Sequence, residues 1–214
     1  GSTDQTAQVA MDAGALVISH LSNKGKGTAI RTGFAYALEH GYEAVVTMDS
    51  DGQHDPTEIP KLLDEAVAKQ AAIVVGNRTL DCGKMPLIRR VTNTVMSAIV
   101  SSLSHQRIPD SQCGFRLVRK EVIQAARLSS RRFDIETELL LAASRGGWTV
   151  SSVPIHTIDH GHHSHIRPVR DGLRFFKVIL RYLFAPPRIE RVNGPTTLLP
   201  REAARPNTED KIAA

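Results

Sequence analysis

The chain has 214 residues, of which 41% are hydrophobic and 23% are charged, as is ordinary for a soluble globular domain with a substantial core. The formal net charge of +5 favours anionic partners such as a nucleotide, a phospholipid surface or nucleic acid. Aromatic residues make up only 5% of the sequence, which argues against modules that stack nucleic-acid bases on aromatic rings. Because no stretch of 18 apolar residues occurs, nothing in this sequence is expected to span a bilayer by itself.

The two cysteines, Cys82 and Cys113, are too few for a disulfide framework, so we expect a reducing compartment and a cytoplasmic location. Five of the nine histidines fall within residues 156–165. Their spacing matches neither a zinc finger nor a helical His-Glu-x-x-His motif, which disfavours a zinc site. We expect instead a loop that closes over a bound phosphate, with His165 and Arg167 as donors.

The first 41 residues are expected to form two helices and one short strand. The opening Gly-Ser-Thr-Asp is typical of a strand-to-helix turn, which predicts that the strand before it is missing from this sequence. The pattern predicts a helix over residues 3–12 and a strand over residues 15–19. The glycine-rich run at residues 23–33 then leads into a helix that continues to about His40 and ends at Gly41.

This glycine-rich run resembles a phosphate-binding P-loop only in part. His20 stands where the first glycine of that motif belongs, and Gly27 stands where its Ser or Thr is required. Backbone N–H groups of the turn can still face a diphosphate, together with Lys24, Lys26 and Arg31. The alternative is a helix cap with a solvated cationic face.

The main functional signal is the stretch AVVTMDSDGQHDPTEIP. Residues 44–48 are short, β-branched and uncharged, which suits a strand buried on both faces of a parallel sheet. Asp49 and Asp51 follow at its carboxyl end, where ligands bind in open α/β sheets, and their oxygens suit one Mg²⁺ or Mn²⁺ that already carries phosphate. Pro56 then opens a helix, with Asp55 as its N-cap.

Two other interpretations of this acidic stretch compete with a metal site. An EF-hand loop does not fit, because the glycine is at the fourth position instead of the sixth and Pro60 replaces the bidentate Glu. A turn rich in Asp and Gly, with solvated carboxylates that cap the helix, fits the local sequence as well as a metal site does. Only the accompanying motifs favour the metal.

Strands and helices alternate with short connections through the first half of the chain. Residues 71–76 form another buried strand, and Asn77 and Arg78 follow at its carboxyl end. This order predicts an α/β fold with a mostly parallel sheet and helices on both faces. Residues 87–104 are expected to form a long helix whose Arg89 and Arg90 lie in the first turn, a placement that opposes the helix dipole but suits an anionic ligand.

The second half continues with a turn and a strand over residues 108–119, a helix over residues 133–145 and a strand over residues 148–156. Asp110 lies just before the first of these strands. It could act as a general base or hold an acceptor, or it could be a turn residue that bonds its own backbone. Arg116 in the same run could pair with it.

A basic amphipathic helix is predicted at residues 168–184. Its cations recur at spacings of three and four, so they share one helical face, and large apolar residues fill the adjoining side. Such a helix suits an anionic bilayer surface, while docking on its own domain with a solvated cationic face is equally compatible. The cations are Arg167, Arg170, Arg174, Lys177 and Arg181, and the apolar residues are Leu173, Phe176, Leu180, Leu183 and Phe184.

Taken in order, these motifs resemble a family 2 glycosyltransferase of the GT-A type, close to its dolichyl-phosphate mannosyltransferase-like branch. The segments that carry the resemblance are residues 1–4, 23–34, 49–60, 76–78, 110–116 and 164–170. The resemblance implies a Rossmann-like GT-A domain at residues 1–166 that lacks its first strand. An amphipathic helix at residues 167–184 and a disordered tail at residues 185–214 would follow.

The resemblance also implies an inverting transfer of a hexose from a GDP- or UDP-linked sugar to a polyprenyl or dolichyl phosphate. Mg²⁺ or Mn²⁺ would bridge the donor diphosphate. The implied metal ligands are Asp49, Asp51 and Gln53, the implied donor and acceptor contacts are Lys26, Arg31, Asp49, Arg78, Ser164 and Arg167, and the implied catalytic residues are Asp110, Asp51 and Arg116. Because a phosphate acceptor is already anionic, Asp110 would organise the site more than it would accept a proton.

The sequence departs from the family pattern at its start, where the first strand, a Pro-x-x-Asn-Glu loop and an acidic pair are absent. We therefore expect weak or no donor binding by this chain alone. Two other functions fit the same motifs: transfer to a soluble or polysaccharide acceptor, and a non-catalytic GT-A scaffold that binds phosphates or membrane surfaces. A peripheral position on the cytoplasmic membrane face is expected, whereas neither a nucleic-acid partner nor an oligomeric state is indicated.

Overall fold

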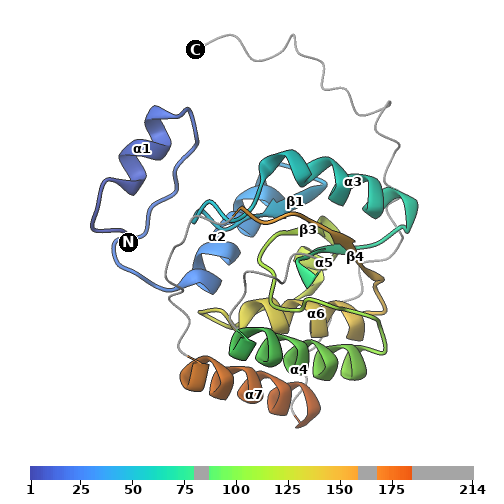
Figure 1. Ribbon diagram of the computed structural model, residues 1–214. Coiled ribbons are helices and arrows are strands. Elements are labelled where there is room, and N and C mark those ends of the chain that lie inside the picture. Colours follow the sequence, from blue (N-terminus) through green and yellow to red (C-terminus); the bar gives the residue numbers. More distant parts are fainter. Residues whose placement is uncertain (80–86, 159–167, 185–214) are drawn as a thin grey trace.

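The computed structural model describes residues 1–79, 87–158 and 168–184 (Figure 1). The predicted tail and the predicted phosphate loop at residues 159–165 lie outside the described residues. The helices and strands are α1 (Thr6–Asp12), α2 (Lys26–Glu39), β1 (Ala44–Thr47), the 3₁₀ turn η1 (Pro56–Glu58), α3 (Ile59–Ala68), β2 (Ile73–Asn77), α4 (Leu87–Ser104), β3 (Arg116–Arg119), α5 (Lys120–Ala125), α6 (Ile135–Arg145), β4 (Val150–Pro154) and α7 (Pro168–Phe184).

A four-stranded sheet of order β1-β3-β2-β4 is the centre of the fold. β3 runs antiparallel to both β1 and β2, whereas β4 is parallel to β2, so β1, β2 and β4 all point the same way. The predicted α/β fold is therefore confirmed, and the reversed β3 makes the sheet mixed. The carboxyl ends of β1 and β2 lie at the same edge of the sheet, which brings the residues after both strands to one side of the molecule.

Helices cover both faces of the sheet, as the alternation of elements predicts. In Figure 1, α3 lies over one face and α6 under the other, and α4 and α7 pack on α6 as a further layer. The apolar run of β2 is buried from both sides, and Leu62 of α3 and Leu140 of α6 belong to the same core. Within the described ranges, no helix combines the length and hydrophobicity needed to cross a membrane.

The segment before α2 differs from the prediction. Residues 15–19, expected as a strand, are irregular and pair with no strand of the described sheet. An isolated run of this length gains no hydrogen bonds from a neighbouring strand, and its Leu16 and Ile18 are exposed. α1 starts at Thr6 instead of residue 3, and the Thr6 N–H donates to Asp4 Oδ1 at 3.1 Å.

The basic helix α7 forms over the predicted residues, but it docks by a face that the prediction did not single out. The side chains that bury this face are Phe175, Val178 and Ile179. Arg181 donates to Glu138 of α6 and to Ser129, so it is not part of a solvated cationic face. The apolar residues predicted for the adjoining side are exposed, namely Leu173, Phe176, Leu180, Leu183 and Phe184.

Two glycines at the start of α2 are required by a close approach of the chain. Gly25 has a φ of +91°, and a Cβ at Gly27 would lie 2.6 Å from the carbonyl oxygen of Ser130. The Gly27 N–H donates to the Arg131 carbonyl at 3.0 Å. The glycine-rich run is therefore needed for packing against residues 130–132.

Gly27 and Gly33 lie on the same helix and make a matched test of this packing. We expect Gly27→Ala to lower the free energy of unfolding by about 1–3 kcal/mol, because the new methyl group overpacks against backbone. At Gly33 a Cβ would meet nothing within 4 Å, so Gly33→Ala should raise the free energy of unfolding by about 0.5–1 kcal/mol. Urea unfolding followed by circular dichroism measures both values, and equal effects would contradict the packing argument.

Candidate active site

The ammonium group of Lys26 joins two carboxylates at the edge where β1 ends. Lys26 Nζ lies 2.6 Å from Asp49 Oδ1 and 2.6 Å from Glu136 Oε1. Burial opposes charge on this ammonium, but Glu136 and Asp49 together raise the pKa of Lys26. Burial likewise opposes charge on Asp49, yet Lys26 holds the pKa of Asp49 below its ordinary value. Lys26 and Asp49 are therefore charged together near neutral pH.

A glycine two residues before β3 allows the Asp49 carboxylate to lie close to the sheet. A Cβ at Gly114 would lie 2.5 Å from Asp49 Oδ2 and 3.0 Å from Lys26 Nζ. The hydroxyl of Thr47 donates to the Gly114 carbonyl at 2.8 Å and fixes this approach. Any larger residue at position 114 would push the carboxylate or the ammonium away.

The loop after Asp49 presents hard oxygen donors to solvent. Asp51 is exposed, and its Oδ1 accepts a hydrogen bond from Gln53 N at 3.0 Å, while the Asp49 side chain is about one third exposed at 34%. Among the described residues, no group of three or more His, Cys, Asp or Glu side chains is arranged to hold a metal. Two carboxylates suffice for Mg²⁺, which usually keeps water and substrate phosphate among its ligands, so the donor set fits such an ion.

The ring of His54 lies under this loop and was not predicted as a site residue. His54 Nδ1 accepts a hydrogen bond from Asp49 N at 3.2 Å, and Nε2 lies 3.9 Å from the Cys113 sulfur. The ring stacks on Phe115 with centroids 5.3 Å apart. Burial lowers the pKa of His54 and raises the pKa of the Cys113 thiol to about 11, so both side chains are neutral at pH 7.

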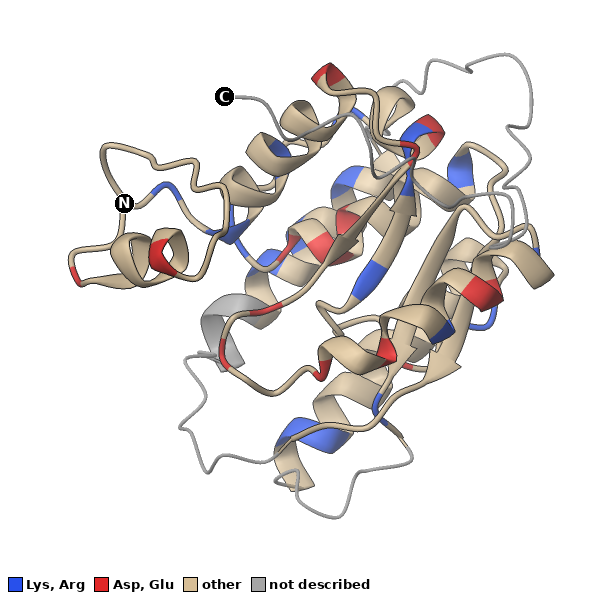
Figure 2. Ribbon diagram, turned by 90° about the horizontal axis from the view of Figure 1, so that it is seen from above, with Lys and Arg blue, Asp and Glu red and all other residues tan. Residues whose placement is uncertain are grey.

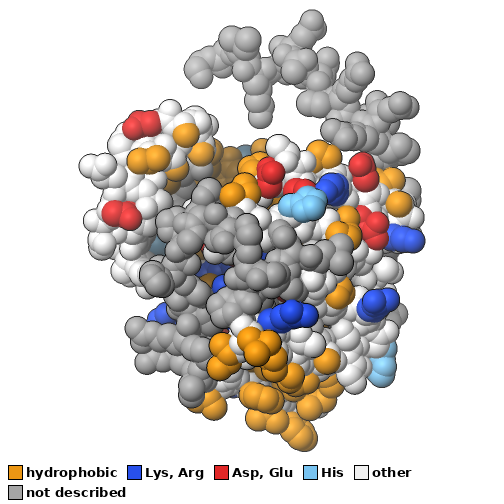
Figure 3. Space-filling model, in the orientation of Figure 1, with side chains coloured by type: hydrophobic (Ala, Val, Ile, Leu, Met, Phe, Trp, Pro, Cys, Tyr) orange, Lys and Arg blue, Asp and Glu red, His pale blue; other side chains and the backbone are white. Residues whose placement is uncertain are grey.

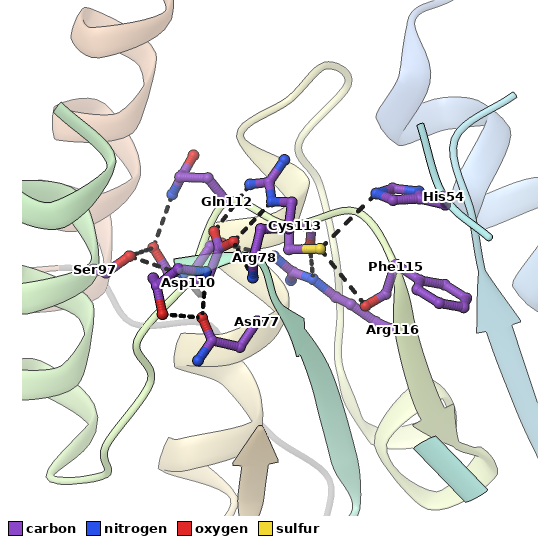
Figure 4. A network of polar contacts seen from close by, with 11 residues as sticks. His54, Asn77, Arg78, Ser97, Asp110, Gln112, Cys113, Phe115 and Arg116 are labelled. Atoms are coloured by element: carbon purple, nitrogen blue, oxygen red, sulfur yellow. Dashed lines mark hydrogen bonds and ion pairs between the residues drawn. The ribbon is translucent and has the colours of Figure 1, made fainter. Parts of the chain in front are cut away.

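Asp110 pairs with Arg78 and not, as proposed from the sequence, with Arg116. Figure 4 shows the pair between the end of β2 and the loop before β3. Arg78 Nε lies 2.7 Å from Asp110 Oδ2, the second guanidinium bond is 2.9 Å, and the Arg78 backbone N–H also donates to Oδ2. Burial favours the neutral acid, but the bonds from Arg78 outweigh it and lower the pKa of Asp110. A carboxylate bound in this way is a poor proton acceptor.

Arg116 is 1% exposed and serves the backbone. Its guanidinium donates to the carbonyl groups of Cys113, Glu136 and Ser111 at 2.6 to 2.7 Å. Arg116 was predicted as a catalytic residue, but its donors are directed at these carbonyls. It fixes the shape of the loop before β3 against the first turn of α6.

Arg89 of α4 lies within the electrostatic influence of the same charges. Its Nε is buried and, within the described residues, has no hydrogen-bond partner. Burial and then the charge of Arg78 lower the pKa of Arg89, whereas Asp110 and Asp51 act on it in the opposite direction. A half-buried guanidinium with an unsatisfied donor beside a second guanidinium fits the anionic ligand predicted for this helix start.

The glycine-rich turn does not form the anion cradle that the sequence allowed. The Gly27 N–H is bonded to Arg131, and Thr28 N and Ala29 N both bond to the Gly25 carbonyl. Arg31 donates to the Leu128 carbonyl at 3.0 Å. The Lys26 side chain, by contrast, contacts the acidic site directly. Ser164 and Arg167 lie outside the described residues.

Glu138 of α6 holds the loop against which the glycine-rich turn packs. Its carboxylate accepts hydrogen bonds from the backbone N–H groups of Ser129 and Ser130 at 2.7 to 3.1 Å. It also accepts from Arg181 of α7. The next residue, Arg131, provides the carbonyl that binds Gly27. α7, α6 and the start of α2 are therefore connected by one continuous set of polar contacts.

Glu136 and His54 were not predicted as site residues from the sequence. Glu136 lies in the first turn of α6, where acids are common for dipole reasons, so its position in the sequence does not mark it as a site residue. Its burial and its contact with Lys26 come from the packing of α6 against the loop before β3. Basic and acidic positions are interspersed along the described parts of the ribbon (Figure 2), so composition alone could not identify the paired ones.

The fold and these motifs belong together in one family. Residues 1–127 match the family described as "Glycosyl transferase family 2", which is more than half of the chain. The chain therefore belongs to glycosyl transferase family 2, and the predicted resemblance is confirmed. Glucosyl-3-phosphoglycerate synthase from Mycobacterium tuberculosis has a similar fold, with a TM-score of 0.64 and 21% identity over 86% of this chain and 65% of that one.

Several curated relatives of the chain have names that include a lipid-phosphate acceptor. A Methanococcus voltae protein named UDP-N-acetylglucosamine–dolichyl-phosphate N-acetylglucosaminyltransferase is 34% identical over 148 residues, which are 67% of this chain and 59% of that protein. A Micrococcus luteus undecaprenyl-phosphate mannosyltransferase is 30% identical over 158 residues, which are 71% of this chain and 64% of that protein. The chain thus spans about three fifths of the length of these relatives.

The Arg78–Asp110 pair predicts an acid-dependent stability. Because the pKa of Asp110 is lower in the folded chain than in the unfolded one, its contribution is complete above the unfolded-state pKa of about 3.9 and is lost as the pH falls through the folded-state pKa. We expect Asp110→Asn to lower the free energy of unfolding by about 3–5 kcal/mol at pH 7, because Arg78 is left buried without its charge partner. That difference should shrink when the pH falls below 4.

Urea unfolding at several pH values measures this difference. The exposed N-cap Asp55, whose Oδ1 accepts from Thr57 N, provides the control. Because Asn caps a helix about as well as Asp, Asp55→Asn should change the free energy of unfolding by less than about 0.5 kcal/mol. A difference between wild type and Asp110→Asn that stays constant with pH would contradict the ion-pair assignment.

Proposed function

We propose that this chain is the catalytic part of a metal-dependent, inverting glycosyltransferase that moves a hexose from a GDP- or UDP-linked donor to a polyprenyl or dolichyl phosphate. The observation that carries the proposal is the meeting of opposite charges at one edge of the sheet. The carboxylates of Asp49 and Asp51 follow β1, Arg78 follows β2, and Arg89 lies in the first turn of α4. A nucleotide diphosphate with its cation and a phosphate acceptor need both kinds of group.

On the donor side, Asp49 and Asp51 would hold Mg²⁺ or Mn²⁺, with Gln53 as a further contact. Such an ion neutralises the negative charge that builds up on a departing diphosphate. Lys26 lies beside Asp49 Oδ1 and is the cation of the α2 turn best placed to reach a donor phosphate. Solved structures of the similar glucosyl-3-phosphoglycerate synthase contain Mn²⁺ and UDP-glucose, which supports this assignment of the donor side.

On the acceptor side, the arrangement favours a nucleophile that is already charged. Asp110 accepts three hydrogen bonds from Arg78, so we assign it the task of holding that guanidinium in place rather than of taking a proton. Arg89, with its unsatisfied buried Nε, is the second cation for an acceptor phosphate. A polyprenyl phosphate oxygen needs no strong base, which agrees with the lipid-phosphate acceptors in the names of the curated relatives.

A continuous apolar surface supports a lipid acceptor. Figure 3 shows hydrophobic side chains gathered over α4 and α7 at the lower end of the molecule. We propose that this surface lies on the cytoplasmic membrane face, with the exposed Lys177 among the cations beside it. The exposed members of the surface are Leu87, Ile88, Val91 and Val95 of α4 and Leu173, Phe176, Leu180, Leu183 and Phe184 of α7.

Transfer to lipid is the direct test of the catalytic proposal. The full-length protein is incubated with membranes and a radiolabelled GDP- or UDP-hexose, and we expect label in a chloroform-soluble lipid. Asp49→Asn and Asp51→Asn should each reduce this transfer by about 100-fold or more, because a lost metal ligand removes several kcal/mol of transition-state stabilisation. Asp55→Asn serves as the control and should retain activity.

The other two functions give different results in the same assay. Label that appears only in water-soluble or polysaccharide products would replace the lipid acceptor with a soluble one. Transfer that is equal in wild type and in both aspartate variants would overturn the metal-centred mechanism. A wild-type protein that transfers nothing while still binding membranes would favour the non-catalytic scaffold.

Membrane contact is tested with vesicles that contain anionic lipid. We expect Leu180→Glu with Leu183→Glu to weaken sedimentation with the vesicles by about tenfold or more, because each large apolar side chain withdrawn from the bilayer forfeits about 1.5–3 kcal/mol. Leu16→Glu with Leu21→Glu, at exposed positions outside α4 and α7, is the matched control and should leave binding unchanged. Equal losses in both pairs would contradict a specific surface.

A further inference from the structure

We propose that His54 is a positioning residue that sets the orientation of Asp49 and ties the acidic loop to two other segments of the site. The proposal deepens the proposed function, because Asp49 is the metal ligand closest to Lys26 in that scheme. Unlike the proposed function, the role of His54 rests on contacts within the chain, and these can be tested without metal or donor.

The first contact fixes the backbone of Asp49. Asp49 N donates to Nδ1 of His54, which lies five residues further along the chain, and the two atoms are 3.2 Å apart. The hydrogen bond closes the loop on itself at the point where β1 ends. A backbone N–H can only donate, so Nδ1 must carry a lone pair and the ring proton must be on Nε2.

The second contact joins the ring to the loop before β3. His54 Nε2 lies 3.9 Å from the sulfur of Cys113, and the ring stacks on Phe115. In Figure 4 the imidazole faces Cys113 and Phe115 across a short gap. Cys113 and Phe115 flank Gly114, whose missing side chain makes room for the Asp49 carboxylate. The ring therefore contacts the residues on both sides of the glycine that makes room for Asp49.

The third contact joins the acidic loop to the chain after β4. His54 forms an isolated antiparallel bridge with Thr157, and Ile158 N donates to the Gln53 carbonyl at 3.0 Å. His54 itself is only 5% exposed, so little of the ring is left to solvent. One side chain and its own backbone thus connect three segments that are far apart in sequence. Loss of the Nδ1 acceptor should release Asp49 while the backbone contacts to Thr157 and Ile158 persist.

Asn and Gln discriminate between the two ring nitrogens. The Oδ1 atom of Asn can occupy the place of Nδ1, whereas the side-chain amide of Gln reaches the place of Nε2 and leaves Asp49 N without an acceptor. We therefore expect His54→Asn to keep the Asp49 orientation and His54→Gln to lose it. His40→Gln, at an exposed histidine on the end of α2, is the matched control.

Two measurements on the metal-free chain test the positioning itself. Nitrogen-15 NMR of the imidazole should show the Nε2-protonated tautomer of His54, and an Nδ1-protonated ring would overturn the proposal. Amide hydrogen exchange at Asp49 should be about five- to tenfold faster in His54→Gln than in wild type, as expected for the loss of one hydrogen bond. In His54→Asn and His40→Gln it should stay within about twofold of wild type.

Manganese binding links the positioning to the proposed function. With the full-length protein, and with Mn²⁺ and GDP or UDP as the probes, electron paramagnetic resonance should show weaker binding in His54→Gln by about fivefold, with His54→Asn close to wild type. If wild type binds no Mn²⁺ under these conditions, the metal-dependent function fails, and the tautomer and exchange results still decide the role of His54. Equal exchange at Asp49 in the Asn and Gln variants would overturn the positioning role even where Mn²⁺ binds.

Discussion

The site depends first on the ammonium of Lys26 held between Asp49 and Glu136. Two carboxylates, one of them almost fully buried, would repel each other and lose hydration without this shared cation. The contact also joins three remote segments, because Lys26 opens α2, Asp49 follows β1 and Glu136 lies in the first turn of α6. Glycines at positions 27 and 114 are what allow these segments to approach so closely.

A second set of buried charges, Arg78 with Asp110 and the nearby Arg116, fixes the loop beside the Lys26 contacts. Arg78 satisfies Asp110 by two guanidinium bonds and a backbone bond, and Arg116 satisfies three carbonyl groups. Both guanidinium groups are buried, so their hydrogen bonds are stronger than they would be in water. The loop before β3 is therefore held in one shape from both of its ends. A rigid loop of this kind suits a site in which separate phosphates must be kept in register.

The sequence was informative where local chemistry decides the structure. The strand before Asp49, the long helix α4 and the helix α7 were predicted because apolar periodicity and turn residues act within a few positions. Three features were not predicted, because each depends on which distant segments become neighbours. They are the reversed direction of β3, the irregular residues 15–19 and the partner of Asp110. His54 was missed for the same reason, since its role arises only when Cys113 and Phe115 pack against it.

A chain of polar contacts connects the outermost helix, α7, to the turn that carries Lys26 at the start of α2. Arg181 holds Glu138, Glu138 holds the N–H groups of Ser129 and Ser130, and the neighbouring Arg131 carbonyl binds the turn that carries the Lys26 ammonium. A change that lifts α7 off α6 would thus loosen the grip on the first carboxylate of the acidic motif. On the proposed function, attachment of α7 to a lipid surface would therefore be coupled to how firmly Lys26 holds Asp49 at the donor site.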